Sequence, residues 1–125
     1  MSIISGILGN ASEIDAKKLE SEFMAILAPG EVIEKAYKLI RDLVVFTNKR
    51  LIMVDKQGFT GKKKQYTSIP YRSIVRFSKE SAGHFDLDAE IKLWLSGSSE
   101  PIQIEFRKDK NIHEVYQVLS TQVLK

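Results

Sequence analysis

The chain has 125 residues, 28% of them charged, with a formal net charge of +3 and no cysteine. A chain of this length forms one domain with its own core, and the lack of thiols excludes disulfides and thiolate metal sites. The small charge excess is too weak to indicate nucleic-acid binding. No apolar run reaches the ~18 residues that cross a bilayer, and the first residues lack the basic start of a signal peptide, so we expect a cytoplasmic protein.

The N-terminal part of the chain predicts an amphipathic helix over residues 12–28. Ser12 and Asp15 resemble a capping box at its start. Apolar residues then recur at helical spacing, namely Ile14, Leu19, Phe23, Ile26 and Leu27. Pro29-Gly30 is expected to end the helix. We therefore expect residues 1–29 to form an N-terminal helical extension and residues 30–125 to form the main domain.

From residue 31 the pattern becomes that of short strands. We expect strands over residues 31–41, 43–47, 50–56, 65–70 and 73–79. The first should place Val32, Ala36 and Ile40 on one side. Thr47 to Arg50 is the expected hairpin turn between the second and third strands, because Asn48 takes a positive φ at little cost.

The last two strands show the clearest pattern in the chain. Residues 87–95 and 102–106 alternate strictly between apolar and polar side chains, which is typical of an antiparallel sheet with one buried face. A final helix is expected to open at Asp109 or Asn111. Its apolar face would hold Ile112, Val115, Tyr116, Leu119 and Val123. The expected fold is mainly β (α+β), with about seven antiparallel strands curled into a barrel that the last helix caps.

Two segments carry a resemblance to a known family. Residues 46–52 read Phe-Thr-Asn-Lys-Arg-Leu-Ile, and residues 68–74 read Ser-Ile-Pro-Tyr-Arg-Ser-Ile. The chain resembles the bacterial pleckstrin-homology-like domains, which often show a Thr-Asn-x-Arg-Leu hairpin and an Ile-Pro-Tyr-x-x-Ile segment. The likeness covers about residues 30–124. It implies a pleckstrin-homology-like barrel of about seven strands with a C-terminal helix, to which this chain adds an N-terminal helix. It also implies a tendency to self-assemble, which gives rings in some members. It does not imply any catalysed reaction.

The wider pleckstrin-homology fold includes domains that bind phosphoinositides through a basic cluster between the first two strands. Here that loop is Ile40 to Leu43, with one arginine beside one aspartate. A loop of this length and charge cannot supply several basic side chains. The resemblance therefore does not extend to inositol-phosphate recognition.

A group of basic residues offers one candidate site. It comprises Lys62, Lys63 and Lys64, with Arg72, Arg76 and Lys79 further along the chain. Anionic lipid headgroups would attract such residues by about 1 kcal/mol each. Nucleic acid is a second anionic partner, with Tyr66 or Phe59 available for stacking. The interpretation that we favour is a solvated loop beside an edge strand that lysines protect from pairing.

An acidic stripe offers a second candidate site. His84, Asp86, Asp88 and Glu90 recur at a spacing of two. Neighbours in such a stripe lie ~7 Å apart along a strand, too far for one cation to collect them, so we expect no metal site. Instead, Asp86, Asp88 and Glu90 of one subunit could meet Arg72, Arg76 or the loop of Lys62 to Lys64 of another, head to tail, as in a ring. Pairing of the same charges within one subunit is the equal alternative.

Trp94 lies on the polar side of its strand, where it marks an interface or is covered by the N-terminal helix. Catalysis has little support, because the chain has no cysteine, no Gly-x-Ser-x-Gly elbow and no phosphate-binding glycine loop, and His113 has no nucleophile nearby in sequence. We expect a non-catalytic module without cofactor or metal. Its partner would be a second copy of itself or another protein. The alternative is an anionic membrane bound through Lys62 to Lys64, and nucleic acid is not expected.

Overall fold

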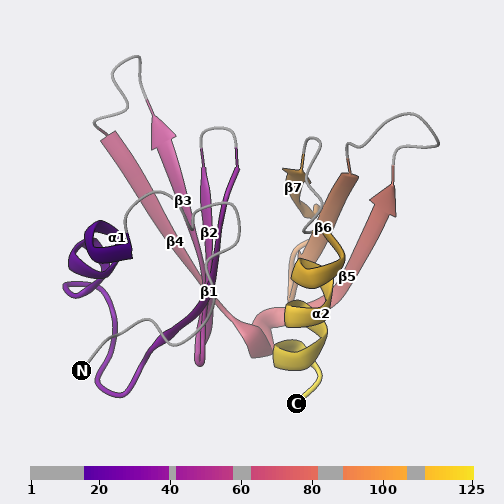
Figure 1. The fold of residues 1–125 in the computed structure, drawn as a ribbon. Coiled ribbons are helices and arrows are strands. Elements are labelled where there is room, and N and C mark those ends of the chain that lie inside the picture. The colour runs from indigo at the N-terminus through magenta and orange to yellow at the C-terminus, as the bar shows by residue number, and fades with distance from the viewer. Residues whose placement is uncertain (1–15, 40–41, 58–62, 82–88, 107–111) are drawn as a thin grey trace. The chain divides into compact units, whose positions relative to one another are not determined.

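The computed structural model of the chain describes residues 16–39, 42–57, 63–81, 89–106 and 112–125 (Figure 1). The chain divides into two compact units, Met1–Ser68 and Ile69–Lys125. Its elements in order are α1 (Ala16–Phe23), β1 (Ile33–Lys38), β2 (Leu43–Thr47), β3 (Arg50–Gln57), β4 (Lys63–Pro70), the 3-10 turn η1 (Tyr71–Ser73), β5 (Ile74–Ser81), β6 (Ala89–Leu95), β7 (Ile102–Phe106) and α2 (Ile112–Val123). None of the helices in these ranges is long and apolar enough to cross a membrane.

The first unit holds a four-stranded sheet in the order β1-β2-β3-β4. The β2–β3 hairpin is antiparallel and pairs Val45 with Ile52, which confirms the predicted turn between residues 47 and 50. Helix α1 contributes two side chains, Leu19 and Phe23, to the core cluster of this unit. Burial of each such side chain contributes roughly 1.5–3 kcal/mol, so the helix is held mainly by apolar contact.

Helix α1 ends five residues earlier than predicted. Regular helix stops at Phe23, and the amides of Ile26 and Leu27 both donate to the Phe23 carbonyl at 2.9 and 3.0 Å. The chain then turns at Pro29-Gly30, where Gly30 has a φ of +79°. The early end frees the Ile26 carbonyl to accept a hydrogen bond from elsewhere in the unit. The predicted start at Ser12 lies outside the described residues.

Strand β1 is shorter than the predicted 31–41, and its buried face differs. The pairing with β2 shifts between Ile33 and Lys35, as in a β-bulge. Ile33, Ala36 and Tyr37 are buried, whereas Val32 is only half-buried. The prediction for Val32 was therefore wrong, because the bulge breaks the simple alternation. Ile40 lies outside the described residues.

The second unit holds a three-stranded antiparallel sheet in the order β5-β6-β7. The predicted alternation is confirmed from residue 89 onwards. The buried side chains of β6 and β7 are Ala89, Ile91, Leu93, Ile104 and Phe106. Helix α2 lies against this face (Figure 1), with the rings of Phe77 and Tyr116 5.2 Å apart. One face of the sheet is thus covered and the other is polar.

Two side chains in this unit depart from the sequence pattern. Val75 is 64% exposed because a bulge between Ile74 and Arg76 turns it out of the buried row. In α2 the buried face ends on Gln122, three residues after Leu119, rather than on the predicted Val123. The prediction chose Val123 because Gln122 is polar. Helical spacing alone places residue 122 on the same face as residue 119.

Candidate functional site

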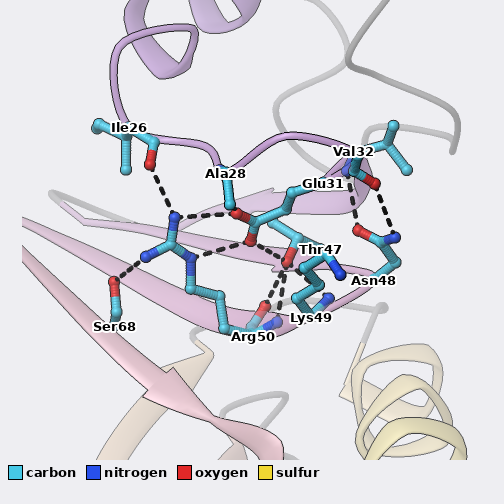
Figure 2. Close-up of polar contacts among 10 residues, drawn as sticks. Ile26, Ala28, Glu31, Val32, Thr47, Asn48, Lys49, Arg50 and Ser68 are labelled. Carbon is cyan, nitrogen blue, oxygen red and sulfur yellow. Dashed lines mark hydrogen bonds and ion pairs between the residues drawn. The ribbon is translucent and has the colours of Figure 1, made fainter.

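The hairpin motif Thr47-Asn48-Lys49-Arg50 forms a polar network with the chain segment before β1 (Figure 2). Two nitrogens of Arg50 donate hydrogen bonds to the Glu31 carboxylate, Nε to Oε2 at 2.9 Å and Nη2 to Oε1 at 3.0 Å. The Thr47 hydroxyl donates to the same carboxylate at 2.6 Å. We call Glu31, Thr47, Asn48 and Arg50 the hairpin network.

The hairpin network also contacts backbone groups of the segment between α1 and β1, and one side chain of β4. Arg50 donates to the Ile26 carbonyl and to the Ser68 hydroxyl, both at 2.9 Å. The Asn48 side chain accepts from the Val32 amide at 2.9 Å and donates to the Gly30 carbonyl at 3.2 Å. The motif therefore ties the loop after α1 to the hairpin and to β4.

Glu31 is a buried charge that is stabilised by its donors. Its side chain is 1% exposed. Burial by itself raises the pKa of this carboxyl, but hydrogen bonds from Arg50, Thr47 and the Ala28 amide outweigh that effect and hold the pKa below its usual 4.5. The carboxylate is thus ionised at neutral pH and fully occupied by its own chain, which is a structural role.

The polar face of the second sheet carries a different arrangement of charge. It presents Arg76, Ser78 and Glu80 from β5, Glu90, Lys92 and Trp94 from β6, and Gln103 and Glu105 from β7. We call this set the outer face. Its side chains alternate with those that α2 covers, because successive residues of a strand point to opposite sides.

Three glutamates of the outer face lie side by side across the strands. Glu90 is paired in register with Glu80 on one side and with Glu105 on the other, and we call the three the acidic row. Like charges directly opposite one another destabilise a sheet. Lys92 approaches Glu90 at 3.5 Å. Within the described ranges, Glu80 and Glu105 have no ion-pair partner.

The other end of the outer face is cationic and aromatic. Arg76 and Trp94 are paired in register on β5 and β6. The Arg76 guanidinium carbon lies 4.0 Å from the centre of the Trp94 ring. Arg72 lies exposed in η1, just before β5. We call Arg76 and Trp94 the cationic end. The structure brings Arg76, Trp94 and Glu90 onto one face, while Asp86 and Asp88 lie outside the described residues.

The predicted lysine cluster is only partly described. Lys62 lies outside the described residues, Lys63 is exposed, and Lys64 makes a 3.3 Å ion pair with Glu22 of α1. The Tyr66 hydroxyl donates to the same Glu22 carboxylate. Burial, together with that carboxylate, raises the pKa of Tyr66 to about 12. Lys64 and Tyr66 thus hold α1 against β4.

Sequence reasoning missed two kinds of residue. It did not pair Glu31 with Arg50, which are 19 positions apart, and it did not assign a role to Glu80 or Glu105. The first omission depends on where the segment before β1 lies, and the second depends on strand register, which alternation alone does not fix. A tight loop was predicted correctly, however, since the Leu39 amide donates to the Asp42 carbonyl at 2.8 Å between β1 and β2.

Comparison with known proteins gives a consistent result. Residues 2–123 match the family described as Bacterial PH domain. The uncharacterized protein YjqA of Bacillus subtilis is 53% identical over 121 residues, which cover 96% of this chain and 97% of YjqA.

Two crystal structures are also similar to this chain. A pleckstrin homology domain from Shewanella amazonensis is 50% identical with a TM-score of 0.81, and the alignment covers 94% of each chain. A protein with a pleckstrin-homology domain from Shewanella loihica is 43% identical with a TM-score of 0.79, covering 88% of this chain and 94% of that one. The predicted pleckstrin-homology-like fold is confirmed.

Proposed function

Because this chain belongs to the bacterial PH domain family, we propose that it is a non-catalytic interaction module that associates with further copies of itself. The observation that carries the proposal is the outer face, where three glutamates lie in one row and an arginine stacked on a tryptophan lies on the same side of the same sheet. A face with separated charges of both signs is complementary to another copy of itself.

The acidic row supports association because its charges are costly in an isolated subunit. Adjacent carboxylates on neighbouring strands repel one another, and a cation from outside would relieve that repulsion. Arg76 of a second copy is such a cation. The Arg76–Trp94 pair also has the composition of interface hot spots, in which arginine and tryptophan are enriched.

The distribution of polar groups argues for binding rather than catalysis. The side chains of the most distinctive motif, Thr47, Asn48 and Arg50, are hydrogen-bonded to Glu31 and to backbone groups of their own chain. Their charges and dipoles are thus engaged in holding the fold. The outer face, by contrast, presents ordered charges of both signs on one side of a sheet. Such a surface suits recognition of a partner protein.

Binding to an anionic membrane through Lys62 to Lys64 is the alternative function. Lys64 is already neutralised by Glu22 at 3.3 Å, which weakens the attraction that this segment would offer to lipid headgroups. Co-sedimentation with anionic vesicles at low salt tests the alternative. Salt-sensitive binding that is lost in a Lys63→Ala, Lys64→Ala double variant would favour the membrane over self-association.

Static light scattering after size exclusion tests the proposed function. We expect the chain at tens of micromolar to have the mass of a defined oligomer. The mass should fall as salt rises from roughly 0.05 to 0.5 M, since the Debye length shrinks from about 14 to about 4 Å over that range. A monomeric mass at low salt and tens of micromolar would overturn the proposal.

A further inference from the structure

We infer that Lys79 is a site of acylation by acyl phosphates, with His113 as the base that takes the proton from its amine. The inference is independent of the proposed self-association. It rests on a contact between β5 and α2, in which Nζ of Lys79 lies 2.8 Å from Nδ1 of His113. Both side chains are exposed, so a small acyl donor in solution can reach them.

The Lys79 side chain is held in place from two sides. It lies on the side of β5 that α2 covers, because its register partner on β6 is the buried Ile91. Its ammonium lies 5.2 Å from the centre of the Tyr116 ring, and a cation at this distance is attracted to an aromatic face. The Tyr116 ring in turn packs against Phe77. A long and flexible side chain is thus kept beside the imidazole.

The chemistry of the two nitrogens decides which one donates. A lysine ammonium has three N–H donors and no acceptor. Nδ1 of His113 therefore accepts, which leaves the imidazole neutral with its own proton on Nε2. Imidazole is the side chain that most often acts as a general base, and it does so at heavy-atom distances of about 2.6–3.2 Å. The contact thus places a base against an amine nucleophile.

The acyl transfer that we infer has a defined path for each bond and proton. The neutral form of the Lys79 amine attacks the carbonyl carbon of the acyl phosphate, and a bond forms between Nζ and that carbon. Nζ is then positively charged, and one of its protons passes to Nδ1 of His113. The carbon–oxygen bond to phosphate breaks, and phosphate leaves with the electron pair. His113 finally releases its proton to water.

Other lysines of the chain provide references of similar exposure. Lys38 and Lys49 are exposed, as Lys79 is. Within the described ranges, His113 is the only histidine, and its imidazole contacts Lys79. Lys79 should therefore be acylated faster than the two reference lysines, because only its amine has an imidazole to remove the proton from the adduct.

Acylation of Lys79 would change the contact between β5 and α2. The product is an amide, which carries no charge. It keeps one N–H donor but loses the attraction of a cation to the Tyr116 ring. His113 is the second residue of α2. The modification would therefore weaken the attachment of the first turn of α2 to β5.

Site-resolved mass spectrometry tests the inference. The full chain is treated with acetyl phosphate, samples are quenched over time, and the remaining amines are labelled with a heavy acetyl reagent before digestion. Each lysine then gives its own rate. We expect Lys79 to react at least about threefold faster than Lys38 and Lys49. A rate for Lys79 equal to or below that of the reference lysines would overturn the inference.

The variant His113→Gln tests the role of the base. Glutamine can accept a hydrogen bond from Lys79 but cannot take up its proton. The Lys79 rate should fall to the level of Lys38, whose own rate should stay unchanged. Tyr116→Phe is the matched control, because it keeps the aromatic ring and should leave the Lys79 rate unchanged. Circular dichroism would confirm that both variants fold. If Lys79 stays fast in folded His113→Gln, His113 is not the base and the inference is wrong.

Discussion

The hairpin network and the outer face use charge in opposite ways. In the first, Glu31 is buried and its carboxylate accepts hydrogen bonds from Arg50, Thr47 and the Ala28 amide. In the second, three carboxylates lie in register on an accessible face, and only one of them has a cation within the described ranges. Paired, buried charge holds a fold together, while unpaired, ordered charge on a surface is available to a partner. The removal of a charge should therefore have opposite consequences in the two regions.

The largest expected effect comes from breaking the hairpin network. Arg50→Ala leaves the Glu31 carboxylate buried without its main partner, which typically costs about 3–5 kcal/mol. We expect the free energy of urea unfolding to fall by about that amount. Lys49→Ala is the control, because Lys49 is the exposed neighbour in the same turn. A loss below about 1 kcal/mol for Arg50→Ala would mean that the network does not hold the first unit together.

The pH dependence of stability should identify the same network. A carboxyl whose pKa is lowered by folding stabilises the protein above its unfolded pKa, and this contribution is lost as the pH falls through the folded pKa. For Glu31 the loss begins near pH 4.5 and continues below it. Urea midpoints measured from pH 7 to pH 3 should fall more steeply for the wild type than for Glu31→Gln. Parallel curves would contradict the assigned pKa direction.

A smaller effect is expected where α1 meets β4. Tyr66→Phe removes the hydroxyl that donates to Glu22 and keeps the ring that contacts Phe23 at a centroid distance of 6.0 Å. A hydrogen bond of this kind contributes about 1 kcal/mol, and more when the acceptor is charged. We therefore expect a loss of about 1–2 kcal/mol in urea unfolding. Thr67→Val, at the next exposed position of β4, should change stability by less.

The smallest expected effect is an increase in stability rather than a loss. Glu105→Gln removes one charge from the acidic row, so it should stabilise the monomer by about 0.2–1 kcal/mol through relief of like-charge repulsion. The same change should weaken self-association, because it lowers the negative charge that the acidic row offers to a partner's cations. Thermal unfolding at low concentration and light scattering at high concentration measure the two effects. A destabilised monomer would show that Glu105 is paired within its own chain.

The sequence predicted most of the fold because alternation and helical spacing report directly on burial. Strand β7 and the buried residues of β6 followed from alternation, and strands β2 and β3 followed from two short apolar runs around a polar turn. The departures arise where a local irregularity overrides periodicity, as at the bulges beside Ile33 and Ile74 and at the early end of α1.

The candidate site was harder to predict than the fold. The hydrophobic pattern placed Glu90 and Trp94 on one polar face, but it did not set the register that aligns Glu80, Glu90 and Glu105. The role of the Thr47-Asn48-Lys49-Arg50 motif was likewise hidden, because its partners Glu31 and Ile26 precede it by many residues. Cross-strand and long-range pairing is a tertiary property, and a single sequence carries little of it.

The most direct test of self-association through the outer face is to mix two variants that cannot associate alone. Arg76→Glu has acidic charge at both ends of the face, and a Glu80→Lys, Glu105→Lys double variant has net positive charge at both ends. Light scattering should give a reduced mass for each variant and the wild-type mass for their equimolar mixture. If each variant alone keeps the wild-type mass, or if the mixture remains at the reduced mass, the outer face is not the surface through which this chain assembles.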